Sequence, residues 1–270
     1  MLRSLYSGVS GMRGFQTKLD VIGNNIANVN TVGFKKSRVM FQDILSQNVA
    51  GATGPVEEEV GGLNPKQVGL GSSIASIDVV HTPGSPMTTN LLTDLAIEGD
   101  AFFVVNPGGD VETNYLTRNG SFTRDALGQL VTSQGMFVLD ADGEVITIPR
   151  EEYTSFSIGK NGVITGTTPE GETEEIATIG VVVVSNPSGL KKIGNSLYEM
   201  TVNANPDGEY EIVTPTEANS AIISGQLEMS NVDLTEEFTE MIVAQRGFQA
   251  NSRIITTSDT ILEELINLKR

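Results

Sequence analysis

The sequence predicts an α+β protein in which N- and C-terminal helices pair as a coiled coil. A long extended linker then joins the first helix to a central, mainly β domain. Near both ends of the chain, apolar residues recur at intervals of seven, which is the spacing of a coiled-coil seam. Short segments rich in β-branched and aromatic residues occupy the middle. Between these regions, residues 50–73 contain six Gly and two Pro and show no periodicity, which indicates a long connection.

Residues 1–32 are predicted to be the N-terminal coiled-coil helix. The apolar residues that we expect on its contact side are Leu5, Met12, Phe15, Leu19, Ile22 and Ile26. The same stretch contains four glycines, each of which costs about 0.8–1 kcal/mol relative to alanine inside a helix. We therefore expect this helix to need a partner and both termini to be largely disordered in the free chain.

The end of the first helix is marked by a cluster of residues that compete for backbone hydrogen bonds or tolerate the left-handed backbone region. These residues are Asn24, Asn25, Asn28, Asn30 and Gly33. We expect them to terminate the helix and to turn the chain into an extended linker over residues 33–75. The acidic run at residues 57–59 in this linker should be solvated, because three adjacent like charges repel one another.

Residues 226–270 are predicted to be the C-terminal coiled-coil helix. Its expected contact residues are Leu234, Phe238, Met241, Phe248, Ile255, Leu262 and Leu265. Asp233, followed three residues later by Glu236, has the spacing of a helix N-cap with its capping-box partner. Residues 1–38 carry six basic side chains and one acidic side chain, whereas residues 226–270 carry four and eight. Charge should therefore favour contact between the two terminal segments.

Residues 76–225 are predicted to form the β domain. Dipeptides such as Asp142-Gly143 and Asn161-Gly162 supply the tight turns of hairpins. The segments that we expect as strands are residues 101–105, 129–132, 136–139, 144–148, 176–184 and 209–213.

The composition excludes several classes of function. The 270 residues include no Cys, no Trp and one His, which excludes thiol catalysis, cysteine zinc sites and sites with two imidazoles. The net charge of −17 argues against a nucleic-acid partner, because phosphate binding needs a concentrated basic surface. No apolar run is long enough to span a membrane, and the N-terminus lacks the apolar segment of a cleavable secretory signal.

Two sets of residues resemble chemical sites without completing one. Asp140, Asp142 and Glu144 lack the twelve-residue ligand pattern of a calcium loop, and a hairpin turn explains them better. His81 lacks a serine elbow and an orienting acid, so we expect it in a solvent-exposed loop. We therefore predict no catalytic residues, no cofactor, no metal and no small-molecule substrate. A secreted calcium- or glycan-binding β module and a hydrolase using scattered carboxylates with His81 are the competing interpretations.

Four segments of the chain resemble one known family. Residues 19–36, LDVIGNNIANVNTVGFKK, closely resemble the N-terminal signature of the bacterial flagellar rod and hook proteins. Residues 229–242, MSNVDLTEEFTEMI, resemble the C-terminal signature of the same family. Residues 95–103, LAIEGDAFF, and 116–122, LTRNGSF, resemble its central signatures, with Ala101 standing where the family usually has glycine.

This resemblance implies a structural subunit of the flagellum that is exported without a cleavable signal and assembles into a helical tube. It implies self-association, contacts with adjacent rod, hook and junction proteins, and interactions with the hook cap and the flagellar export apparatus. The terminal helices would line the inner tube, and the linker would contact neighbouring subunits. Residues 61–71, GGLNPKQVGLG, resemble hook proteins, so the sequence favours a hook subunit. The alternative is a distal rod subunit, which the short chain favours because it leaves no room for an extra outer domain.

Overall fold

The computed structural model describes residues 2–54, 61–108, 113–150 and 152–268, and the chain forms two compact units. Unit 1 comprises Met1–Ala27, Ser37–Val79 and Asp233–Arg270, and unit 2 comprises Asn28–Lys36 and Val80–Val232. The chain therefore passes between the units four times. Two short segments that flank the predicted helices, residues 28–36 and 226–232, belong to unit 2.

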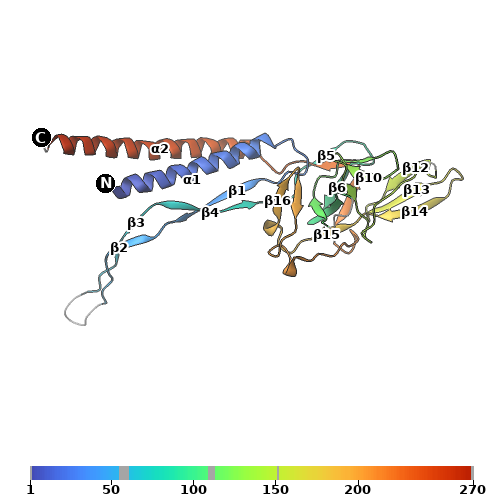
Figure 1. The fold of residues 1–270 in the computed structure, drawn as a ribbon, viewed down its shortest axis with the longest axis horizontal. Helices are drawn as coiled ribbons and strands as arrows, with labels where there is room; N and C mark the ends of the chain where they lie inside the picture. The colour runs from blue at the N-terminus through green and yellow to red at the C-terminus, as the bar shows by residue number, and fades with distance from the viewer. Residues whose placement is uncertain (1, 55–60, 109–112, 151, 269–270) are drawn as a thin grey trace. The chain divides into compact units, whose positions relative to one another are not determined.

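Two long helices of unit 1, α1 (Leu2–Ala27) and α2 (Leu234–Asn267), pack against each other (Figure 1). The prediction of helices at both ends that pack together is thus confirmed. The carboxylate of Asp233 caps α2 by accepting hydrogen bonds from the amides of Thr235 and Glu236, at 2.8 and 3.3 Å. No helix in the described part of the chain is long and apolar enough to cross a lipid bilayer.

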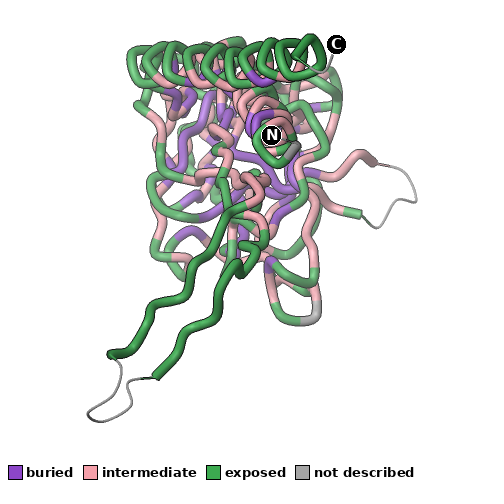
Figure 2. The backbone as a smooth tube through the Cα atoms, turned by 90° about the vertical axis from the view of Figure 1, so that its left-hand side faces the viewer, coloured by how far each residue is buried: buried purple, intermediate pink, exposed green. Residues whose placement is uncertain are grey.

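The segment expected as an extended linker is an antiparallel ribbon in its described part. In this ribbon β1 (Ser37–Asp43) pairs with β4 (Ser72–Val79), and β2 (Ser46–Ala50) pairs with β3 (Lys66–Gly69). Figure 2 shows the outer part of the ribbon as exposed. Its paired strands lie far apart in the sequence, so no short hairpin signal marks them. The sequence predicts an extended linker over residues 33–75, and the structure adds that much of this segment is paired as β-strands.

Unit 2 is built from antiparallel strands. Its largest sheet has the order β16-β17-β8-β7-β11-β10-β9, with β15 also paired to β7, and a second sheet has the order β12-β13-β14. Two further pairs, β18 with β6 and β19 with β5, complete the unit. Its strands are β5 (Pro86–Thr88), β6 (Leu95–Glu98), β7 (Ala101–Asn106), β8 (Tyr115–Thr117), β9 (Phe122–Arg124), β10 (Leu130–Thr132), β11 (Phe137–Val138), β12 (Ser155–Ile158), β13 (Val163–Thr167), β14 (Thr173–Thr178), β15 (Val181–Val183), β16 (Lys191–Gly194), β17 (Leu197–Glu199), β18 (Ala221–Ser224) and β19 (Gln226–Glu228).

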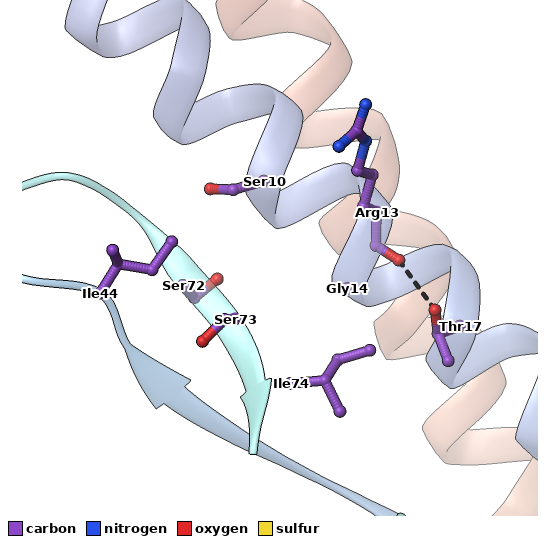
Figure 3. A pocket seen from close by; sticks show the side chains of 8 residues that line it. All are labelled: Ser10, Arg13, Gly14, Thr17, Ile44, Ser72, Ser73 and Ile74. Carbon is purple, nitrogen blue, oxygen red and sulfur yellow. Dashed lines mark hydrogen bonds between the residues drawn. The ribbon is translucent and has the colours of Figure 1, made fainter. Parts of the chain in front are cut away.

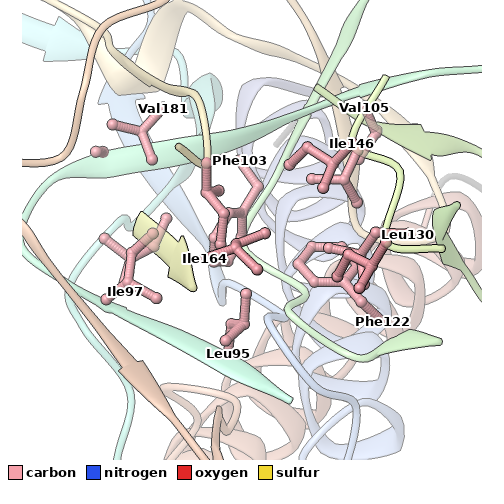
Figure 4. Close-up of a cluster of buried hydrophobic side chains, with 14 of the residues drawn as sticks. Leu95, Ile97, Phe103, Val105, Phe122, Leu130, Ile146, Ile164 and Val181 are labelled. Atoms are coloured by element: carbon pink, nitrogen blue, oxygen red, sulfur yellow. The ribbon is translucent and has the colours of Figure 1, made fainter. Parts of the chain in front are cut away.

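The strand β7 is the centre of this unit, and it is buried on both faces. Alternate residues Phe103 and Val105 contribute to one hydrophobic cluster, whereas Phe102 and Val104 contribute to a second. Figure 4 shows the first cluster, in which the rings of Phe103 and Phe122 meet edge to face at 5.2 Å. The continuous apolar run at residues 101–105 therefore reflects burial on both sides of one strand.

Three of the expected strands differ from the structure. Residues 144–148 and 209–213 make only isolated bridges, such as Leu139 to Val145 and Val181 to Val213. Residues 176–184 contain the end of β14 and then β15, which belong to different sheets because Ile179 and Gly180 separate them. A run of β-branched residues gives strand propensity, but the neighbouring strand decides whether a ladder forms.

Candidate assembly site

The contact between α1 and α2 places small residues opposite large ones. A Cβ atom on Gly11 would lie 2.9 Å from the amide nitrogen of Asn251, and one on Gly8 would lie 3.3 Å from Ile255. On the opposite helix, a Cβ atom on Gly247 would lie 2.6 Å from the ring of Phe15. From Gly8 to Phe15 the residue numbers of α1 rise while those of the contacting residues of α2 fall from Ile255 to Gly247, so the two helices are antiparallel. Two of the glycines that weaken α1 by helix propensity, Gly8 and Gly11, are therefore positions at which α1 packs directly against α2.

Polar contacts continue this seam toward the end of α1. Lys18 forms an ion pair with Glu240, and the buried amide of Asn25 donates a hydrogen bond to Glu237 at 3.2 Å. Glu237 is also buried, and together with Ala244, Asn251 and Ser258 it forms a series at intervals of seven along α2. Polar groups at a helix contact restrict its register, because any shift leaves them without their partners.

The predicted contact residues are distributed around this seam rather than along its centre. Ile22 is buried, and Phe15 lies against Gly247. The expected residues that are half-buried are Leu5, Met12, Leu19, Ile26, Met241, Ile255 and Leu262. Those that are exposed are Leu234, Phe238, Phe248 and Leu265. The series at 234, 241 and 248 flanks the buried positions, which are small or polar and therefore gave no apolar signal.

The asparagines at the end of α1 fall into two groups. Asn24 and Asn25 lie inside the helix, whereas Asn28 and Asn30 lie in the turn that follows its end at Ala27. The side chain of Asn25 accepts a hydrogen bond from the amide of Ser37 at 3.0 Å and donates one to the carbonyl of Ser37 at 2.9 Å. Asn25 thereby ties the first residue of β1 to the helix pair. Gly33 has a φ of 67°, which favours glycine.

The ribbon packs on α1 through an aromatic contact and encloses a pocket beside it. The ring of Phe41 lies 5.8 Å from that of Phe15, and a Cβ atom on Gly14 would lie 2.7 Å from Phe41. Figure 3 shows the pocket, with a volume of about 270 Å³. From α1 it is lined by Ser10, Arg13, Gly14 and Thr17, and from the ribbon by Ile44, Ser72, Ser73 and Ile74.

Unit 1 exposes many large apolar side chains, with the largest group on α2. Figure 2 shows α2 as mostly exposed along its length. Its exposed apolar side chains are Leu234, Phe238, Ile242, Val243, Phe248, Ile254, Ile261, Leu265, Ile266 and Leu268. On the ribbon, Leu45 and Val49 are exposed as well. Clusters of exposed apolar side chains are typical of surfaces that bind other proteins.

Unit 2 contains a buried ionic cluster, which we call the junction and define by Lys35, Arg118 and Glu228. Glu228 pairs with Lys35 and lies 3.4 Å from Nη1 of Arg118, and all three side chains are at most 5% exposed. Lys35 also donates to the carbonyl of Thr82, and the amide of Gly84 donates to Glu228 at 2.9 Å. Burial lowers the pKa of Lys35 and of Arg118, whereas the Glu228 carboxylate opposes this shift.

The junction holds together the segments at which the chain passes between the units. Lys35 lies next to the passage at residue 36, Thr82 follows the passage at residue 79, and Glu228 precedes the one at residue 232. Asn231 accepts a hydrogen bond from the amide of Lys36 and donates one to the carbonyl of Val80, each at 2.8 Å. These bonds explain why residues 28–36 and 226–232 belong to unit 2.

His81 is not in a solvent-exposed loop, so that expectation is wrong. Its ring lies 5.7 Å from Phe102 and 5.4 Å from Tyr198, and both ring nitrogens are shielded from solvent. Local sequence around His81 is polar, but the buried aromatic residues come from β7 and β17, which are distant in the chain.

The acidic turn at residues 140–144 forms a tight hairpin turn. The amide of Gly143 donates to the carbonyl of Asp140 at 3.0 Å, and the Asp140 carboxylate accepts from the amide of Thr178 at 3.0 Å. Within the described ranges, no three Asp, Glu, His or Cys side chains gather as a metal site would require.

Comparison with known proteins identifies the class to which this fold belongs. A model described as flagella basal body rod protein matches residues 5–35, and one described as the flagellar hook protein FlgE/F/G D1 domain matches residues 96–166. A third, the C-terminal region of flagellar basal body rod FlgEFG proteins, matches residues 223–268. These matches define an axial protein of the bacterial flagellum.

Full-length relatives give the same assignment. The flagellar basal-body rod protein FlgG of Bacillus subtilis (strain 168) is 53% identical over the whole of both chains. FlgG of Borreliella burgdorferi is 40% identical, and the flagellar hook protein FlgE of that organism is 29% identical, again over the whole of both chains. The chain belongs to the family of flagellar basal-body rod and hook proteins, and the resemblance seen in the sequence is confirmed.

The family signatures converge on the junction. Lys35 lies in the N-terminal signature and Arg118 in a central one, while Glu228 directly precedes the C-terminal one. The guanidinium of Arg118 also donates to the carbonyls of Ile97 and Gly99, which belong to the other central signature. Sequence reasoning missed this cluster, because charged residues so far apart in the chain give no sign of contact.

Proposed function

We propose that the chain is a structural subunit of the distal rod of the flagellar basal body, which polymerises into a tubular axial structure and transmits torque. The identity of 53% to a FlgG over the full length of both chains is the observation that supports this proposal. The alignment to the FlgE of Borreliella burgdorferi spans 448 positions against 276 for the two FlgG proteins, so the chain matches the rod relatives in length as well.

A hook subunit is the second candidate, because residues 61–71 resemble hook proteins. The full-length similarity to rod proteins outweighs this short segment. The sequence analysis favoured the hook over the rod, and the rod is favoured here. In either position the subunit is a structural element and not an enzyme.

We propose unit 1 as the part that binds neighbouring subunits. Its exposed apolar surface on α2 and on the ribbon supports this assignment. The antiparallel helix pair would extend into a coiled-coil arrangement with the helices of adjacent copies in the inner tube. The subunit would contact adjacent rod, hook and junction proteins and interact with the hook cap and with the export apparatus, which would export it without a cleavable signal.

The position in the flagellum can be tested by imaging. Hook-basal bodies would be isolated from cells in which the only copy of the protein carries an epitope tag in an exposed loop of unit 2, and decorated with antibody. We expect decoration of the straight segment below the hook. Decoration of the curved external hook would support the second candidate, and decoration of neither would exclude both.

A further inference from the structure

Arg118 of the junction and two residues beside it have buried polar atoms that lack hydrogen-bond partners among the described residues. They are both ring nitrogens of His81, Nε of Arg118 and the hydroxyl of Tyr198. Such atoms are rare in folded proteins, and each needs an explanation. These three residues are neighbours, because the rings of His81 and Tyr198 both lie beside Phe102, and the guanidinium of Arg118 lies 5.0 Å above the same ring.

The charged groups that face His81 are mostly cationic. Lys35 comes from the segment before β1, Arg118 follows β8, and Lys192 comes from β16. The nearby carboxylates are Glu228 on β19 and Asp100 between β6 and β7, and both act on Lys35 and Arg118. Tyr198 and Phe102 supply uncharged rings. A positive charge on the imidazole would therefore be repelled by three cationic side chains and would lose hydration.

We propose that His81 is an acid-sensitive latch of the junction, which holds its chain segments together while the imidazole is neutral and releases them when the imidazole is protonated. The neutral ring packs between Phe102 and Tyr198, directly before Thr82, whose carbonyl accepts from Lys35. A charged ring at this site loses hydration and faces three cationic side chains, so protonation favours a state in which the segment that carries His81 has left Phe102 and Tyr198. This inference is independent of whether the subunit lies in the rod or the hook.

The direction of the pH dependence follows from linkage. Burial, together with Lys35, Arg118 and Lys192, lowers the pKa of His81 to about 4 in the folded chain, from an ordinary value of about 6.5. The unfolded chain therefore binds a proton that the folded chain excludes between these two pH values. The contribution of the neutral His81 to folding stability is therefore fully present above about pH 6.5 and is lost progressively as the pH falls toward 4. At pH 5 the folding equilibrium constant should be lower by about 30-fold from this residue alone.

The protein has a single histidine, so its titration can be observed directly. In NMR spectra of the full chain with ¹³C-labelled histidine, the imidazole resonances should titrate more than 1.5 pH units lower in the folded protein than in the urea-unfolded protein. An imidazole that titrates at the same pH in both states would overturn the proposal, because the latch would then have no differential protonation.

Two variants test the consequence for stability. His81→Gln keeps a neutral polar side chain, and His81→Phe places an apolar ring between Phe102 and Tyr198. The denaturant midpoint of unit 2 would be measured at pH 7.5 and pH 5 for the native chain and for each variant. The carboxylates are the same in all three proteins, so their protonation should change the stability of each by a similar amount. We expect the native chain to lose about 30-fold more in its folding equilibrium constant than either variant that folds. Equal losses in the native chain and the variants would overturn the proposal.

Discussion

The ring of Phe15 on α1 occupies the space in which a side chain at position 247 of α2 would stand. A Cβ atom on Gly247 would lie 2.6 Å from Cζ of Phe15, closer than carbon atoms approach without displacement. The same relationship holds in reverse at Gly11, where the side chain of Asn251 fills the space. Large side chains of one helix therefore pack against glycines of the other. At Gly11 and Gly247 this packing role outweighs the low helix propensity of glycine.

Replacing Gly247 by alanine should destabilise the helix pair although alanine is the better helix former. Displacing Phe15 by one methyl group should cost about 1–3 kcal/mol, which exceeds the gain of about 0.5–1 kcal/mol in propensity. Gly23→Ala is the matched control, because no atom lies within 4 Å of a Cβ atom there, and it should stabilise the pair. Thermal unfolding followed by helical circular dichroism measures both effects. An equal rise of the two midpoints would contradict the packing role.

Asn25→Ala should loosen the connection between α1 and the ribbon. It removes both hydrogen bonds to the backbone of Ser37, which is half-buried, and the one to the buried Glu237. The expected loss is about 1–3 kcal/mol in the free energy of unfolding of unit 1, measured by denaturant titration. An exposed residue of the same helix, Gln16, gives the control, and Gln16→Ala should change the free energy by less than about 0.5 kcal/mol.

Glu228→Gln should strongly destabilise unit 2. It removes the carboxylate that pairs with Lys35 and Arg118 and leaves two buried cations without their counter-charge, at a cost of about 3–5 kcal/mol. Glu199→Gln breaks the surface pair with Lys191 and should cost less than about 1 kcal/mol. The free energies of unfolding from urea titrations compare the two, and similar small losses would show that the junction does not hold unit 2 together.

Phe41→Ala should weaken the packing of the ribbon, at β1, against α1. The Phe41 ring contacts Phe15 and covers Gly14, and removing it takes away the aromatic contact between the ribbon and the helix pair. The rate of tryptic cleavage after Lys66 on β3 should rise several-fold. Leu45→Ala, at a side chain that is 82% exposed, should leave the rate unchanged. Cleavage at the same rate in both variants would mean that the ribbon is held by other contacts.

The sequence predicted the elements whose signals are local. Seven-residue periodicity placed both helices, Asp233 marked the start of α2, and the apolar run at residues 101–105 marked β7. The elements that it missed depend on distant partners. Nothing near Ser37 shows that it pairs with Val79, and nothing near Lys35 shows that it meets Glu228, 193 residues away.

The centre of the helix contact was missed for a related reason. Periodicity was read from the apolar residues, whereas the most buried positions of α2 are Glu237, Ala244 and Ser258. Small and polar residues carry no hydrophobic signal, so only the position of α1 shows that they face it. His81 was misjudged in the same way, because its aromatic neighbours are supplied by other strands.

The claim that unit 1 is the assembly element is tested most directly by deleting residues 1–27, which removes α1 and leaves Asn28–Lys36 of unit 2 in place. The full chain and the truncated chain would be incubated over the same concentration range, with isolated hook-basal bodies as nuclei, and analysed by sedimentation and electron microscopy. We expect the full chain to form tubular polymers and the truncated chain to remain a monomer that retains the unfolding transition of unit 2. Tubular polymers formed by the truncated chain, or none formed by the full chain, would contradict the account.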